Sequence, residues 1–179
     1  MKKQFLALMI MFLLIFILTG CDFGNLKPSD TVDFKDHHST FKISAPTSIS
    51  LVSYKDTTDE EVSDMYLYSE TEDIYVLGSV YENYTETSFL EDVEEDRLVF
   101  VEGFEYTDLS TVTKLTIKDY EAYTYNFVYK DNDEINFFRQ VIWIKGNNYT
   151  YILDLEVPID TFDVHEDTLN KIAESFTEL

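Results

Sequence analysis

The chain has 179 residues, and 35 Asp and Glu against 13 Lys and Arg give it a net charge of −22 at neutral pH. Nucleic-acid phosphates and anionic lipid headgroups would repel such a surface, so neither is an expected partner of the folded part. With 13 Tyr and 14 Phe but only five Gly and three Pro, the composition also excludes a low-complexity or disordered chain.

The first 20 residues are typical of an export signal. Lys2 and Lys3 precede an uninterrupted non-polar run from Phe5 to Leu18. These 14 residues would form a helix of about 21 Å, which is too short to cross about 30 Å of hydrocarbon. A short non-polar run after a basic start indicates a signal peptide rather than a membrane span.

The signal ends in Leu18-Thr19-Gly20-Cys21, which resembles the lipobox of bacterial lipoproteins. The resemblance implies that the Cys21 thiol carries a diacylglyceryl group and that cleavage makes Cys21 the new N-terminus, with palmitate an expected acyl chain. Two acyl chains give stable anchoring, at about 0.8 kcal/mol per buried CH₂. Cys21 is the only cysteine, so the mature chain would have no disulfide. The expected location is the extracytoplasmic face of the cell membrane.

Residues 21–40 are expected to be a flexible tether. They mix glycine, proline and charged residues, and no period of 2 or 3.6 persists in their non-polar positions. His37 and His38 lie near two aspartates at the end of this segment, a combination that binds divalent metals in some proteins. Adjacent histidines in a flexible segment lack the supporting hydrogen bonds of a metal site, so we expect a solvated linker and no metal.

Residues 41–179 are expected to form one domain. Short runs of alternating non-polar and polar residues predict strands, and Pro46 ends the first of them. Gly78, inside a strand, predicts a bulge or a close approach between segments. In chain order, the expected elements are strands at 41–44, 65–69, 74–81 and 112–117, a helix at 88–101 between the last two of these strands, and a further short extended piece at 49–54.

The expected helix at 88–101 carries an acidic run. Ser88 and Glu91 are spaced as a capping box, which marks the N-terminus of a helix. One face of the helix is only partly non-polar, so it should cover an edge or half of a sheet. The acidic residues are expected to be a solvated surface or, alternatively, a docking surface for an envelope protein. They are Glu91, Asp92, Glu94, Glu95 and Asp96.

The strongest pattern predicts three consecutive antiparallel strands within residues 120–157. Two of the runs alternate with a period of two, whereas the run from Ile135 to Ile144 between them is nearly continuous in its non-polar residues. Such a strand should be central and buried on both faces. A final helix is expected at 165–177, where Leu169, Ile172 and Ala173 lie on one non-polar face together with Phe176.

The expected fold class is α+β, with a single antiparallel sheet of six to seven strands flanked by helices. The strand ending in Pro46, the hairpins between Tyr120 and Tyr151 and the closing Ile172-Ala-Glu-Ser-Phe176 are similar to motifs of the PsbP-like superfamily. The resemblance implies an antiparallel sheet between helices and carries over no catalytic residues. The chain lacks the Gly-Trp that follows the proline in that family. A cystatin-like or nuclear-transport-factor-like curved sheet is the alternative fold.

The sequence favours a non-catalytic binding or assembly module held at the membrane through Cys21, with an envelope protein as its partner. It contains no Gly-x-Ser-x-Gly, no His-Glu-x-x-His, no phosphate loop and no Cys-x-x-Cys, so neither an enzyme nor a cofactor is expected. The alternative is a protein that binds a small ligand or a divalent ion such as calcium, with tyrosines lining a cleft beside the sheet. Tyrosines at strand spacing more often serve packing between strands.

Overall fold

The computed structural model describes residues 30–54, 64–69, 71–82, 88–102, 105–131 and 134–179. They form two antiparallel sheets and two α-helices, so the α+β class is confirmed. The larger sheet has the order β3-β4-β5-β10-β9-β8-β6, and β7 also pairs with β8. Its strands are β3 Val52–Ser53, β4 Met65–Tyr68, β5 Tyr75–Glu82, β6 Tyr106–Thr107, β7 Thr113–Ile117, β8 Tyr120–Lys130, β9 Asn136–Lys145 and β10 Tyr149–Pro158.

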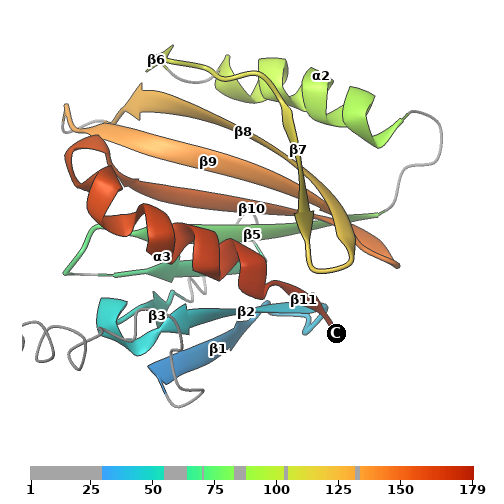
Figure 1. The fold of residues 1–179 in the computed structure, drawn as a ribbon, viewed down its shortest axis with the longest axis horizontal. Coiled ribbons are helices and arrows are strands. Elements are labelled where there is room, and N and C mark those ends of the chain that lie inside the picture. The colour runs from blue at the N-terminus through green and yellow to red at the C-terminus, as the bar shows by residue number, and fades with distance from the viewer. Residues whose placement is uncertain (1–29, 55–63, 70, 83–87, 103–104, 132–133) are drawn as a thin grey trace, which may run out of the picture.

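The smaller sheet has the order β1-β2-β11 and lies beside the C-terminal helix (Figure 1). Helix α2 lies on one side of the large sheet, whereas α3 and the small sheet lie on the other. The remaining elements are β1 Thr31–Lys35, β2 Phe41–Pro46, β11 Thr177–Glu178, α2 Phe89–Val101, α3 Phe162–Ser175 and the 3₁₀ turns η2 Thr47–Ile49 and η3 Ile159–Thr161.

The three-stranded meander predicted within residues 120–157 is confirmed as β8, β9 and β10. The registers pair Tyr123 with Trp143 and Ile152 with Trp143, so these three side chains lie on one face of the sheet. As expected, β9 is central, because it is hydrogen-bonded to β8 on one side and to β10 on the other. The meander therefore provides two faces that both need cover.

The main core lies between the large sheet and the layer of α3 and β2. Leu169, Ile172 and Ala173 of α3 are buried there, which confirms the predicted non-polar face. The helix begins three residues before the expected start and ends at Ser175. Gly78 in β5 is a point of close approach, since a Cβ there would lie 2.5 Å from the Phe41 ring.

The junction after α3 locks the helix onto β2. The Ser175 hydroxyl donates to Ser44 O at 3.1 Å and accepts from Ser44 N at 2.7 Å. Phe176 is fully buried, with its ring centroid 5.0 Å from that of Tyr151 and 5.6 Å from that of Phe41. The Ser-Phe pair of the closing motif therefore joins the helix, the small sheet and the large sheet.

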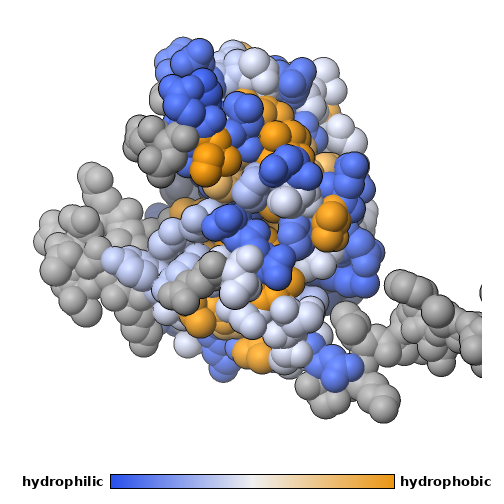
Figure 2. All heavy atoms as spheres, turned by 90° about the vertical axis from the view of Figure 1, so that its left-hand side faces the viewer, coloured by the Kyte–Doolittle hydropathy of each residue, from blue (hydrophilic) through white to orange (hydrophobic). Residues whose placement is uncertain are grey.

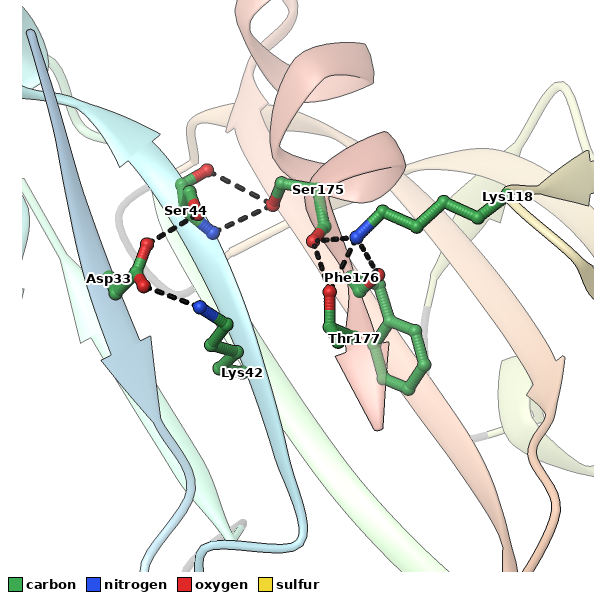
Figure 3. Close-up of polar contacts among 7 residues, drawn as sticks. All are labelled: Asp33, Lys42, Ser44, Lys118, Ser175, Phe176 and Thr177. Atoms are coloured by element: carbon green, nitrogen blue, oxygen red, sulfur yellow. Dashed lines mark hydrogen bonds and ion pairs between the residues drawn. The ribbon is translucent and has the colours of Figure 1, made fainter. Parts of the chain in front are cut away.

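Lys118 completes this junction from the turn between β7 and β8 (Figure 3). Its ammonium group donates to Phe176 O at 2.7 Å, to Ser175 O at 2.9 Å and to the Thr177 hydroxyl. The last carbonyls of a helix lack partners within the helix and carry partial negative charge, so a lysine there satisfies them and favours the helix dipole.

The second sheet corrects two expectations. Instead of a single sheet of six to seven strands, the structure has an eight-stranded sheet and a three-stranded one. The expected tether also ends earlier, because Thr31–Lys35 forms β1 and pairs with β2. The buried Asp36 carboxylate closes this hairpin by accepting from the backbone amides of His38, Thr40 and Phe41. A loop whose backbone amides are bound by its own aspartate has the same polar composition as a solvated linker, so the sequence does not distinguish the two.

The capping box of α2 is confirmed, since Ser88 and Glu91 each accept a hydrogen bond from the other's backbone amide. The helix covers only part of its side of the sheet, as expected. Val93 is fully buried against β8, whereas Leu90, three residues earlier, is 41 % exposed. One side of the large sheet is thus covered along β8 and left more open towards β4 and β5.

Candidate binding site

A row of charged side chains crosses the α2 side of the large sheet. In β10 the odd-numbered residues face the main core, and the even-numbered Asp154 and Glu156 face the α2 side together with Ile152. The register places Glu156 opposite Arg139 of β9, which lies on the same face. The period of two in the strands therefore brings one guanidinium and two carboxylates together.

The three charged groups form a buried ionic cluster. Arg139 Nη2 lies 2.9 Å from Asp154 Oδ2, and Arg139 Nη1 lies 2.9 Å from Glu156 Oε1. Their exposed fractions are only 7–8 %. A buried charge is tolerated only when it is paired and hydrogen-bonded. The two buried carboxylates therefore need the Arg139 guanidinium beside them.

Two tyrosines from β8 extend the cluster towards α2. The Tyr129 hydroxyl donates to Glu156 Oε2 at 2.7 Å, and the Tyr125 hydroxyl donates to Asp96 Oδ2 at 3.1 Å. Asp96 comes from α2, so a third carboxylate joins this face. The indole Nε1 of Trp143 lies near the Asp96 carboxylate and favours its charged form, yet this buried nitrogen reaches no acceptor in hydrogen-bonding geometry.

Burial dominates the electrostatics of this cluster. It raises the pKa of the Asp154 and Glu156 carboxyls, and the nearby Arg139 opposes that rise without cancelling it. Burial likewise raises the pKa of Asp96, which Tyr125 partly offsets. The face thus holds three carboxylates and one guanidinium. When all are ionised, this excess of negative charge suits the recognition of cations rather than of anions.

The structure separates the five residues of the expected acidic docking surface. Glu91 caps the helix, Asp96 is half-buried against Tyr125, and Glu94 pairs with Arg97 at 3.2 Å. Glu95 is exposed, and Asp92 in the first turn is half-buried. The exposed part of the acidic run is therefore centred on Glu94 and Glu95, and whether it binds a partner stays a prediction.

Other residues singled out in the sequence form no site in the described part of the chain. His38 Nε2 lies 3.7 Å from Asp64 Oδ1, a weak contact at the surface. Among the residues that the structure describes, no three His, Cys, Asp or Glu side chains are placed to share a metal ion. Cys21 and the lipobox residues before it lie outside the described ranges. No helix within those ranges is both long and non-polar enough to span a membrane.

The ionic cluster was missed in the sequence analysis. Asp154 and Glu156 fall at the polar positions of an alternating strand, a pattern that also fits a row facing solvent, whereas Arg139 interrupts a nearly continuous non-polar run. Only the register shows that the three residues meet. The end of the molecule seen in Figure 2 has several separate hydrophobic patches among hydrophilic residues, rather than one large non-polar surface.

No family model matches the chain, and no curated protein matches it either. Solved structures do. The cyanobacterial PsbP protein CyanoP from Synechocystis sp. PCC 6803 is 12 % identical with a TM-score of 0.64, covering 90 % of this chain and 99 % of that one. LpqN of Mycobacterium tuberculosis, described as involved in cell envelope biogenesis, is 11 % identical with a TM-score of 0.58, covering 86 % and 98 %.

The Saccharomyces cerevisiae Ran-binding protein Mog1p is a third similar structure. It is 10 % identical with a TM-score of 0.52, and the match covers 83 % of this chain and 95 % of that one. At such identities the likeness concerns the fold alone. The fold is PsbP-like, which confirms the resemblance drawn from the strand ending in Pro46, the hairpins and the closing Ile172-Ala-Glu-Ser-Phe176.

We predict that Arg139→Met lowers the free energy of unfolding by about 3–5 kcal/mol, because it leaves two buried carboxylates without a cation. The measurement is urea denaturation followed by circular dichroism. Lys171→Met is the matched control, since Lys171 pairs with Asp167 on the exposed surface of α3 and its loss should cost no more than about 1 kcal/mol. If the two variants lose the same free energy of unfolding, the ionic cluster contributes no more to stability than an exposed ion pair does.

The raised pKa of Glu156 predicts a pH dependence of stability. Because the folded-state pKa lies above the unfolded value of about 4.3, ionising Glu156 opposes folding at neutral pH, and this penalty disappears as the pH falls towards that value. Glu156→Gln removes the ionisation and still accepts from Tyr129. Its free energy of unfolding should therefore gain less than that of wild type between pH 7 and pH 5. The free energies of unfolding are measured by urea denaturation at each pH. If those of wild type and Glu156→Gln change in parallel with pH, the pKa of Glu156 is not raised.

Proposed function

We propose that the chain is a lipid-anchored bacterial lipoprotein whose folded domain is a non-catalytic binding or assembly module on the extracytoplasmic face of the cell membrane. The observation that carries the anchor is Leu18-Thr19-Gly20-Cys21 placed directly after a signal-length non-polar run. The PsbP-like fold supports the module, and so does its likeness to LpqN, which is described as an envelope protein.

The anchor would hold the domain close to the bilayer. Thr31, the first residue of β1, follows Cys21 by ten residues, so the extended chain between them reaches at most about 35 Å. The strongly negative domain would be repelled by anionic headgroups at that distance rather than lie on them. Its exposed surface would then face other proteins of the envelope.

The outer surface of α2 is the docking surface that we propose for an envelope protein. Glu94 and Glu95 are exposed there, next to Leu98 and Val99, which are 55 % and 61 % exposed. Non-polar side chains surrounded by charge are typical of protein interfaces, in which a hydrophobic centre lies within a polar rim. The exposed aliphatic residues on this helix support a partner.

The anchor predicts that Cys21→Ser moves the protein out of the membrane fraction, because the serine hydroxyl cannot take the thioether-linked lipid. Membranes are washed with carbonate and the protein is followed by immunoblotting. Wild type should stay with the membranes, and the variant should be recovered in the soluble fraction. Retention of the variant after the wash would refute lipid anchoring.

The docking surface predicts a position-dependent crosslink. With Cys21 lipidated, Glu95→Cys supplies the only free thiol, to which a photoreactive group is attached in intact cells. One envelope protein should be crosslinked from position 95 and identified by mass spectrometry. Glu166→Cys on α3, an exposed glutamate on the opposite side of the molecule, is the matched control and should not capture it. The same products from both positions would contradict docking at α2.

A further inference from the structure

The part of the α2-side face that α2 does not cover is rich in tyrosine. The strand registers continue the row of Glu156 into Tyr75 of β5 and Tyr68 of β4, and the row of Asp154 into Leu77 and Tyr66. All four of these neighbours remain partly accessible to solvent. The open face thus begins where the buried carboxylates end.

The tyrosines of this open face contact one another. The ring of Tyr54, which is 42 % exposed, lies 5.5 Å from that of Tyr66 and 6.3 Å from that of Tyr68. The Tyr75 ring lies 5.9 Å from that of Phe137, on the neighbouring side of the ionic cluster. Tyr81, 44 % exposed, stacks on Trp143 at 6.5 Å with an angle of 11° between the rings. Together they form an aromatic surface over several strands.

These rings lie within the field of the buried carboxylates. Burial raises the pKa of the Tyr66 and Tyr75 hydroxyls, and the negative charge of Glu156 raises both further. The pKa of Tyr81 is likewise raised by burial first and then by the charges of Asp96 and Asp154. Electron-rich rings next to a cluster with more carboxylates than cations attract organic cations through both the ring faces and the net negative charge.

We propose that this open tyrosine face is a docking site for an arginine-rich segment of a partner polypeptide, with guanidinium groups over the rings of Tyr66, Tyr75 and Tyr81 and towards the carboxylates behind them. A guanidinium stacks on aromatic rings and is weakly hydrated, so it suits a face that is only half open to water. The charge of this face is complementary to that of an arginine-rich segment, because the face holds three carboxylates and only one guanidinium, that of Arg139.

A divalent metal fits this face less well. Calcium takes six to eight oxygen ligands, whereas oxygens of Asp154 and Glu156 already accept from Arg139 and Tyr129. An aromatic surface spread across strands offers little to a hard cation but much to an extended chain with spaced cationic groups. The inference goes beyond the proposed function, because docking here requires neither the lipid on Cys21 nor the exposed face of α2.

The experiment uses the full chain purified in detergent and a blocked hexa-arginine peptide as the probe, in 150 mM salt to screen weak surface attraction. Trp143 is the only tryptophan and stacks on Tyr81, so its fluorescence reports on this face. We expect a saturable change in emission. Tyr66→Ala and Glu156→Gln should each weaken binding about fivefold, the loss of one cation–π contact or one nearby charge.

Two matched controls separate this site from general attraction to an acidic protein. Glu166→Gln removes one exposed negative charge from α3, and Tyr149→Ala removes a tyrosine of similar exposure to Tyr54 from outside the face. Both should bind the peptide as wild type does. Should Tyr66→Ala fail to give a cooperative melt, Tyr54→Ala tests the same contact from a more exposed position.

The inference is overturned if Tyr66→Ala and Glu156→Gln bind as wild type does, or if Glu166→Gln weakens binding as much as Glu156→Gln. If calcium alone changes the Trp143 emission, and Glu156→Gln removes this change, the face is an ion site. That result would overturn the inference that it binds an arginine-rich segment. Loss of membrane anchoring in Cys21→Ser leaves these titrations unaffected. Failure of the proposed function and failure of this inference are thus distinguishable.

Discussion

The structure depends on how two non-polar faces of one eight-stranded sheet are covered by few other elements. On one face α3 and the small sheet bury Phe41, Ile172 and Phe176 against β10 and β5. The Ser175 and Lys118 hydrogen bonds hold that cover in place. On the other face α2 buries only a limited area next to β8, and the rest must be stable while partly in contact with water.

Tyrosines and an ionic cluster allow that second face to be stable while it is only partly covered. A tyrosine ring packs as a non-polar group while its hydroxyl stays hydrated or finds a buried acceptor, as Tyr129 does on Glu156. The cluster of Arg139, Asp154 and Glu156 is harder to explain by stability alone, since well-packed non-polar residues would serve as well or better. Its excess of carboxylate beside accessible rings is the basis of the docking site that we propose on this half of the fold.

Local patterns predicted most elements of the fold. The capping box at Ser88 and Glu91, the alternation in β8 and β10 and the non-polar face of α3 each depend on residues close together in sequence. The small sheet was not predictable in this way, because β1 needs β2 as its partner and β11 joins them from the other end of the chain. By sequence alone, β1 resembles part of a tether and β11 resembles the end of a helix.

The sequence by itself predicted an export signal and a lipobox-like Leu18 to Cys21. It also determined the α+β class, the meander and the resemblance to the PsbP-like superfamily, because each depends on contiguous residues or on their period. Tertiary structure alone decided that Arg139 meets Asp154 and Glu156, that Asp96 turns inward to Tyr125, and that the tyrosines of β4 and β5 stay open. The physical reason is strand register. Residues far apart in sequence become neighbours only through a pairing that the hydrogen bonds of the whole sheet select together.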